Sequence, residues 1–217
     1  MNDGMIESSA EQLKEALWER YQWAVAGEWA VAALEHLLKT GEWLEKLLAQ
    51  LPRREPQAWI RRYLKATFTR PGWMGNLSPL KGKSFVFPRS QVRLMPGVEQ
   101  VSHGSAHIIH ELGHVLDNAL GGALPATFVG GGAADRMVAA VGGKPERCTP
   151  RFVPMRDYVA KVTPLESWTP PDAYGNTCVA EDFAEAFVLT LVSPLRVPPG
   201  RKADRKSTRL NSSHGKL

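Results

Sequence analysis

Hydrophobic residues recur at helical spacing through most of the first 70 residues. From position 8 to about position 51, apolar side chains fall three or four residues apart among Ala, Glu and Lys, which predicts amphipathic helices. Gly27 and Gly41 interrupt this pattern and divide it into about three helices. The first apolar stripe contains Leu13, Leu17, Tyr21, Ala24 and Val25.

A further amphipathic segment, QAWIRRYLKATF at 57–68, precedes the Pro/Gly turn RPGWMGN. Residues 1–70 are therefore expected to form a helical N-terminal region. Its many tryptophans are expected to fill the core of that region.

The pattern changes after residue 83. The segment SFVFPRSQVRLM at 84–95 nearly alternates β-branched and aromatic residues with others, and Pro88 would lie at a turn or an edge. This segment predicts a hairpin. Together with the helices that follow it, the hairpin predicts a compact α+β domain with a small β-sheet over residues 71–203.

Three helices are predicted beyond the hairpin. The first begins with Ser102 or Ser105 as its N-cap and ends at Gly121–Gly122. The second, at 134–141, lies within a stretch rich in glycine and turn residues, and the third occupies 179–194.

The net charge gives no reason to expect nucleic-acid binding when residues 204–217 are left out of the count. Composition is ordinary for a globular protein, at 43% hydrophobic and 23% charged, but the formal net charge is +5. Residues 204–217 begin DRKSTRLNSSH, which resembles the translation of a common short-read sequencing adapter. We expect this tail to be an artefact that replaces the true C-terminus. Its four basic residues and one acidic residue contribute +3, which leaves +2 for residues 1–203.

Cysteine content and hydropathy restrict the class of protein further. Cys148 and Cys178 form neither a disulfide framework nor a CxxC metal clip, although a single bridge between them is permitted. No apolar run approaches the ~20 residues that span a bilayer, so no membrane partner is expected. The start, MNDGMIESSAEQ, lacks the order of a secretory signal. A cytoplasmic location is favoured and export by a non-classical route is left open, while nothing in the sequence bears on oligomeric state.

The segment HELGH at 110–114 is an HExxH pattern. Residues four apart lie one turn above each other on a helix, so His110 and His114 can face one zinc ion. Glu111 is the next residue round the helix from His110, where its carboxylate can act as a general base toward a water molecule. Chance alone gives such a pattern in a chain of this composition on the order of one time in a hundred.

A catalytic zinc ion takes three protein ligands and one exchangeable position. Metzincins would have Gly and His where this chain has Asp117 and Leu120, and the cysteine ligand of peptide deformylases precedes the motif, whereas both cysteines here follow it. The remaining source is a glutamate on a separate helix. Asp117 shares a helix face with His110 and His114, and we expect it to accept a hydrogen bond beside the ligands rather than to be one.

Two acids in the segment 179–194 suit this role. Glu181 and Glu185 are four apart on a line that continues into Val188 and Val192, so they would repel each other unless a cation lay beside them. Glu181 is predicted to be the third ligand. Glu185 is predicted to orient one ligand imidazole. The alternative is an amphipathic helix with two solvated acids.

The segments HELGHVLDN and EDFAEAF, with Tyr174 seven residues before Glu181, resemble the catalytic domain of anthrax lethal factor and its relatives, which are zincins of the glutamate-ligand type. The resemblance covers roughly residues 84–194. It implies a zincin-like fold with an active-site helix and a ligand helix, and a zinc metallopeptidase with one Zn²⁺ held by His110, His114 and Glu181. It also implies that Glu111 is the base and that Tyr174 donates to the developing oxyanion.

The expected partner is a protein or peptide substrate, extended along an edge strand for which SFVFP or QVRLM is the candidate. Two alternatives remain open. Bacterial metallopeptidases that cleave phage-type repressors also match HELGH and the later helix, although Glu185 stands where they have asparagine. The second alternative is a catalytically inactive, zinc-stabilised binding module of a phage or mobile-element protein, against which the presence of Glu111 argues.

Overall fold

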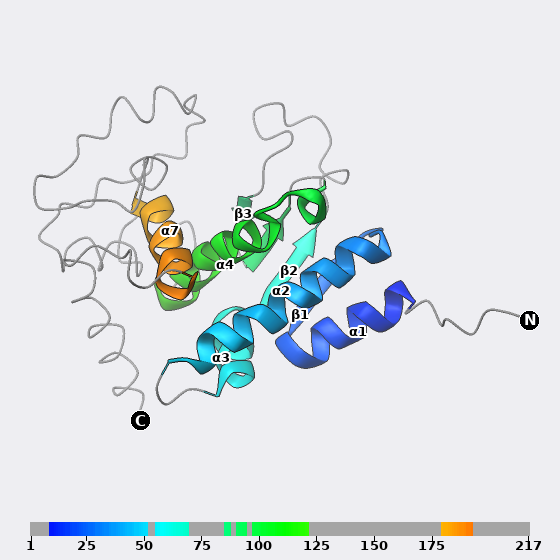
Figure 1. The fold of residues 1–217 in the computed structure, drawn as a ribbon, viewed down its shortest axis with the longest axis horizontal. Coiled ribbons are helices and arrows are strands. Elements are labelled where there is room, and N and C mark those ends of the chain that lie inside the picture. The colour runs from blue at the N-terminus through cyan, green and yellow to red at the C-terminus, as the bar shows by residue number, and fades with distance from the viewer. Residues whose placement is uncertain are drawn as a thin grey trace, which may run out of the picture.

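The computed structural model describes residues 9–51, 55–69, 85–87, 90–94, 97–121 and 179–192. These residues form a mixed α and β architecture in which helices pack on a small sheet (Figure 1). None of the helices within these ranges is long and apolar enough to cross a membrane. Some features predicted from the sequence lie outside the described residues, namely the helix at 134–141, Cys148, Tyr174, Cys178 and the tail 204–217.

The strands within the described ranges form one sheet of four, in the order β1-β2-β4-β3. Strands β1 (Trp23–Ala26) and β2 (Ala66–Thr69) pair in parallel, and β2 pairs in parallel with β4 (Gln91–Arg93). Strand β3 (Phe85–Phe87) pairs with β4 in antiparallel fashion, which confirms the predicted hairpin. Of the two candidate substrate segments, only SFVFP contributes an edge strand within the described residues, through Phe85–Phe87, because β4 is enclosed between β2 and β3.

The prediction of a purely helical region over residues 1–70 is wrong. Helices α1 (Ala10–Tyr21), α2 (Val31–Ala49) and α3 (Pro56–Tyr63) are present, but β1 follows α1 and β2 follows α3. Strands of four residues are too short to show alternation, and their pairing depends on partners about 40 residues away. Since β2 pairs with β4, the sheet also runs across the boundary predicted between residues 70 and 71.

Helix α1 begins and ends with clear local signals. Ser9 and Gln12 form a capping box, in which each side chain accepts from the backbone N–H of the other. Gln22 ends the helix in the left-handed region, with φ of 59°, and directs the chain into β1. The inner face of α1 buries three side chains, those of Leu13, Leu17 and Tyr21.

The sequence predicted that Gly41 separates two helices, but this residue lies inside α2. A side chain at this position would overlap the ring of Tyr21, so the glycine lets α1 and α2 approach closely. The helix continues because the packing of Tyr21 against α2 compensates for the low helix propensity of glycine.

The core on the helical side of the sheet is built around Trp23. Its ring packs between those of Tyr21 and Phe68, with centroid distances of 4.8 and 5.2 Å, and its indole N–H donates to the Leu64 carbonyl at 2.9 Å. The prediction that tryptophans fill the core is confirmed for Trp23. Trp18 differs, since it is 43% exposed.

Helices α4 (Gly104–Gly121) and α7 (Val179–Val192) complete the described fold and pack against each other (Figure 1). Helix α4 also contacts α2, α3, β3 and β4, and it buries a continuous apolar face. This face consists of Ile108, Ile109, Leu112, Val115 and Leu116. Both helices begin and end within about two residues of the predicted positions.

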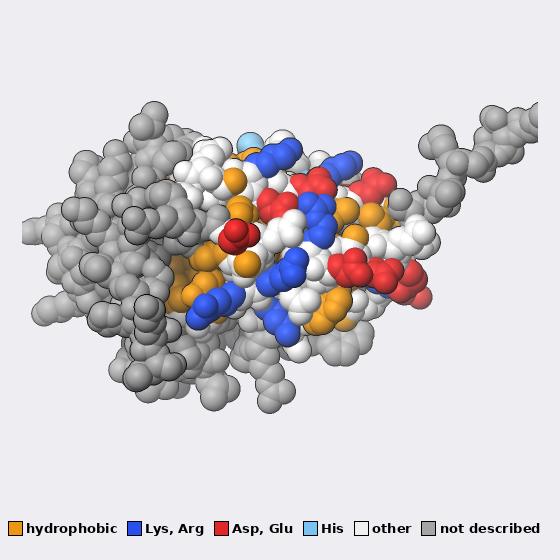
Figure 2. Space-filling view, turned by 90° about the horizontal axis from the view of Figure 1, so that it is seen from below, with side chains coloured by type: hydrophobic (Ala, Val, Ile, Leu, Met, Phe, Trp, Pro, Cys, Tyr) orange, Lys and Arg blue, Asp and Glu red, His pale blue; other side chains and the backbone are white. Residues whose placement is uncertain are grey.

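Charged side chains on the described part of the surface are of mixed sign. In the view of Figure 2, Lys and Arg side chains are interspersed with Asp and Glu side chains. Arg20, for example, pairs with Glu42 at 2.7 Å and with Glu45 at 2.9 Å, which links α1 to α2.

Candidate metal centre

Helix α4 presents His110 and His114 on the side that faces α7. The two residues are one helical turn apart, and their imidazole rings meet edge to face with centroids 4.9 Å apart. Their Nε2 atoms are 3.2 Å apart. His110 is 7% exposed, so this side of the motif is removed from bulk water.

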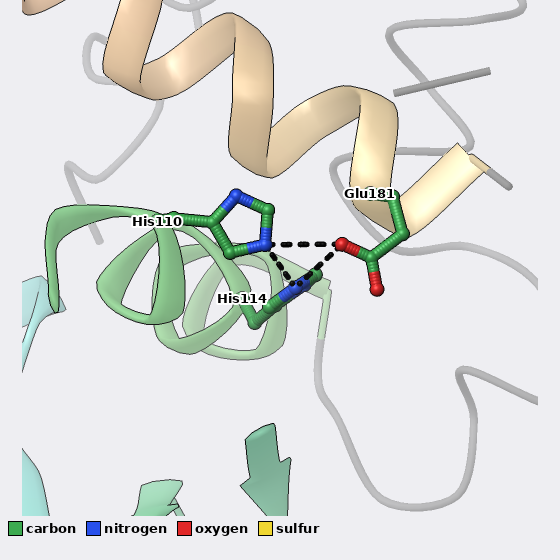
Figure 3. A group of neighbouring side chains, drawn as sticks. All are labelled: His110, His114 and Glu181. Carbon is green, nitrogen blue, oxygen red and sulfur yellow. Dashed lines mark hydrogen bonds and ion pairs between the residues drawn. The ribbon is translucent and has the colours of Figure 1, made fainter. Parts of the chain in front are cut away.

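Glu181 reaches the histidines from the first turn of α7 (Figure 3). Its Oε2 atom lies 3.0 Å from Nε2 of His110 and 3.3 Å from Nε2 of His114. The structure therefore brings together the three residues predicted as zinc ligands, and they are also the described side chains whose donor atoms lie close enough to hold one metal ion.

A close crossing of α4 and α7 allows this approach. A Cβ atom on Gly113 would lie 2.9 Å from Cα of Ala184 and 3.2 Å from its Cβ, so glycine is needed where the helices touch. Gly113 lies between the histidines on α4, and Ala184 lies between Glu181 and Glu185 on α7. Two small residues thus set the distance between the two sets of donors.

The donor triangle fits a tetrahedral ion. Zinc bonds of about 2.0–2.1 Å in tetrahedral geometry separate the ligand atoms by roughly 3.3–3.4 Å. The three observed separations are 3.0, 3.2 and 3.3 Å. Two imidazole nitrogens and one carboxylate oxygen are also a donor set that zinc accepts, with one position left open.

Glu185 contacts the other nitrogen of His110. Its Oε1 atom is 2.9 Å from His110 Nδ1, so the ring is held between Glu181 at Nε2 and Glu185 at Nδ1. This is the position predicted for Glu185 from its spacing, and a carboxylate there fixes the orientation of a ligand imidazole.

Electrostatics at the site favour positive charge. Burial opposes protonation of His110, but hydrogen bonds that its ring donates to Glu181 and Glu185 outweigh burial and raise the pKa of His110 to about 10. The pKa of His114 is likewise raised, because the Glu181 carboxylate outweighs burial. Burial would raise the pKa of Glu181, but the neighbouring imidazoles lower it well below its usual range. A bound cation would supply the same positive charge that these protons supply.

Glu111 lies beside the donor triangle without belonging to it. It is 4% exposed, and burial raises its pKa to about 7 against the opposing charges of His114 and His110. Within the part of the chain that the structure describes, no hydrogen-bond partner reaches its Oε2 atom. A buried carboxyl oxygen without a protein partner has capacity for a water molecule or a substrate group.

Asp117 lies on the same helix at 4% exposure, and it is not a member of the donor triangle. A polar cluster that was not predicted from the sequence joins the start of α4 to α2. In this cluster the Ser105 hydroxyl lies 2.9 Å from the Thr40 hydroxyl and 3.4 Å from His36 Nε2. Nothing in the local pattern indicates this contact, because its members are about 65 residues apart.

Comparisons of the chain with known protein families, with curated proteins and with solved structures found no match.

Proposed function

We propose that the chain is a zinc-dependent metalloendopeptidase of the zincin type, with His110, His114 and Glu181 as the zinc ligands. The observation that carries this proposal is the convergence of two Nε2 atoms and one carboxylate oxygen, which lie 3.0–3.3 Å from one another. They come from two helices, and His110 and Glu181 are 71 residues apart in the sequence. A surface helix with solvated histidines would not require Glu181 to lie half-buried against them.

The position of Glu111 supports a catalytic rather than a structural site. A zinc site that only holds a fold together is closed by four protein ligands and has no use for a base. Here three donors converge, and the buried Glu111 carboxyl lies next to them with an oxygen that has no hydrogen-bond partner among the described residues. This arrangement leaves a position for an exchangeable water molecule.

The roles of His110, Glu111 and Glu185 follow from this geometry, whereas the role of Tyr174 follows from the resemblance alone. Zinc, when bound, would polarise the water molecule and the scissile carbonyl. Glu111 would accept the proton of the attacking water and pass it to the leaving amine. Glu185 would hold His110 in a fixed orientation through Nδ1. Tyr174, which the resemblance to lethal factor implies, would donate a hydrogen bond to the carbonyl oxygen as its negative charge develops.

The arrangement of strands supports a peptide substrate. Among the strands that the structure describes, β3 lies at an edge of the sheet; it is antiparallel to its neighbour β4 and contacts α4. An edge strand offers unpaired backbone groups that an extended peptide can match. The scissile bond of a peptide bound there would lie near the helix that carries the metal ligands.

Three variants test the proposal on one preparation of the full chain. Glu181→Ala and His114→Ala each remove a ligand, so both are expected to lose zinc and peptide hydrolysis together. Glu111→Gln is expected to keep near one equivalent of zinc while hydrolysis falls by orders of magnitude, because the amide cannot accept a proton. Glu15→Gln, a change at an exposed position of α1, is the matched control and should retain both properties.

The inactive binding module predicts a different result. In that case Glu111→Gln changes nothing that can be measured, and a peptide library is not cleaved by the parent protein loaded with zinc. Retention of zinc by Glu181→Ala at the affinity of the parent would contradict the ligand assignment itself.

A further inference from the structure

Three polar side chains hold the start of α4 against α2. Ser105 is the second residue of α4, and its Oγ atom lies 2.9 Å from Oγ1 of Thr40 and 3.4 Å from Nε2 of His36. Thr40 and His36 are one turn apart on α2, where the Thr40 hydroxyl also contacts the His36 carbonyl at 2.8 Å. None of the three residues has a role in the proposed function.

The donors and acceptors of this cluster fix the direction of each hydrogen bond. A carbonyl oxygen only accepts, so the single proton of the Thr40 hydroxyl is donated to the His36 carbonyl. The Ser105 hydroxyl therefore donates its own proton to Thr40 Oγ1, and it accepts from the His36 ring. His36 thus carries a proton on Nε2. The cluster is a directed chain that runs from this ring through two hydroxyls to the backbone of α2.

Gly104 lets the start of α4 lie directly against the His36 ring. A Cβ atom on Gly104 would overlap the carbonyl oxygen of Val98 and would lie 2.9 Å from Nε2 of His36. Gly104 and Thr40 are buried, and Ser105 and His36 are half-buried. Bulk water therefore competes with these hydrogen bonds only in part, which makes them stronger than bonds at an exposed surface.

Hydrogen bonds restrain the position of α4 along its axis more tightly than its apolar contacts do. The face that α4 buries is apolar, and apolar contacts have no preferred direction, whereas a hydrogen bond requires a defined distance and angle. A metal site tolerates changes of about 0.2 Å in its ligand distances. A displacement of α4 by the rise of a single residue, about 1.5 Å, is far larger than this tolerance.

We propose that the hydrogen-bonded chain of His36, Thr40 and Ser105 positions the metal centre, because it fixes α4 along its axis relative to α2. Ser105 lies five residues before His110, about one and a half turns, so the helix carries a displacement of its first turn to the metal ligands. None of the three belongs to the donor triangle, so they are positioning residues. This role rests on the proposed function, whereas the direction of the hydrogen bonds does not.

An NMR spectrum of the imidazole rings in the metal-free full chain tests the direction of the hydrogen bonds, because it shows which ring nitrogen carries a proton. The His36 ring is expected to carry a proton on Nε2, and Ser105→Ala should change its signals. Ser102→Ala removes a hydroxyl from an exposed position just before α4, so it is the matched control and should leave those signals unchanged. A His36 ring protonated on Nδ1 alone would overturn the chain.

Zinc titration of the full chain tests the positioning role. Ser105→Ala is expected to weaken zinc binding by about 3- to 10-fold, the scale of a modest coupling between sites, and Ser102→Ala should bind zinc as the parent does. A loss of stability alone would not change the zinc affinity of the chains that remain folded. His36→Gln keeps an N–H donor and should bind zinc nearly as the parent does, whereas His36→Phe keeps a ring without a donor and should bind as weakly as Ser105→Ala.

The outcomes separate the two proposals. A parent that binds zinc with the same affinity as Ser105→Ala would overturn the positioning role and leave the proposed function intact. Equal losses of affinity in His36→Gln and His36→Phe would also overturn the positioning role, since the donor would then make no difference. A parent that binds no zinc would contradict the proposed function and the positioning role together.

Discussion

Gly113 and Ala184 meet at the crossing of α4 and α7, where a Cβ atom on the glycine would lie 2.9 Å from the Cα atom of the alanine. This contact sets the separation of the helix that carries the histidines from the helix that carries Glu181. Glycine inside a helix costs about 1 kcal/mol relative to alanine, so its presence here reflects the contact and not the preference of the helix.

Gly113→Ala is therefore expected to destabilise the protein, although the same change in a free helix would stabilise it. The added methyl group must push α7 away or distort α4, at a cost of about 1–3 kcal/mol. Displacement of α7 also moves Glu181, so zinc affinity should fall. Chemical denaturation and zinc titration measure the two effects. Gly113→Ala combined with Ala184→Gly should recover part of both, since only the contact between the two Cβ atoms is relieved.

The site was more predictable than the sheet, for a physical reason. The spacing of His110 and His114 is enough to place both rings on one helix face. Glu181 is recognisable because it is an acidic residue on a helix line that continues into apolar residues. Strands β1 and β2 have no comparable local signal, because four residues are too few to define a period and their parallel pairing joins distant segments. The contact between Gly113 and Ala184 also joins distant segments. A glycine inside a predicted helix, as at Gly113, is a local sign of close packing, but nothing in the sequence identifies Ala184 as its partner.

Gly41 illustrates how tertiary packing changes the meaning of a residue. From the sequence alone Gly41 is predicted to break a helix, whereas in the structure the ring of Tyr21 packs against it. Gly41→Ala is expected to cost about 1–3 kcal/mol of unfolding free energy, because the overlap with the ring outweighs the gain in helix propensity. In a Tyr21→Leu background the smaller side chain leaves room, so the cost of Gly41→Ala should shrink markedly. Equal costs in the two backgrounds would show that the two residues are not coupled.

Tyr174→Phe tests the residue that rests on resemblance alone. If Tyr174 donates to the developing oxyanion, loss of its hydroxyl should lower kcat on the order of 10²-fold while bound zinc and the melting temperature stay unchanged. Tyr63→Phe, a change on the half-buried tyrosine of α3, keeps a phenyl ring in place and should turn over peptide at the parental rate. Full turnover by Tyr174→Phe would remove this tyrosine from the mechanism and leave the zinc ligands unaffected.

Removal of metal should lower the stability of the parent protein. The two imidazoles and Glu181 are brought together only in the folded chain, so zinc binds the folded state and stabilises it by mass action. At free zinc about a thousand times the dissociation constant this amounts to about 4 kcal/mol, which for a chain of this size corresponds to a melting shift on the order of 10 °C. Thermal unfolding with and without a chelator measures it. Glu181→Ala should show little response to the chelator, because its affinity is already reduced, whereas Glu15→Gln should show the whole shift. A parent whose melting temperature does not change when metal analysis confirms that zinc has been removed would contradict a site that holds α4 and α7 together.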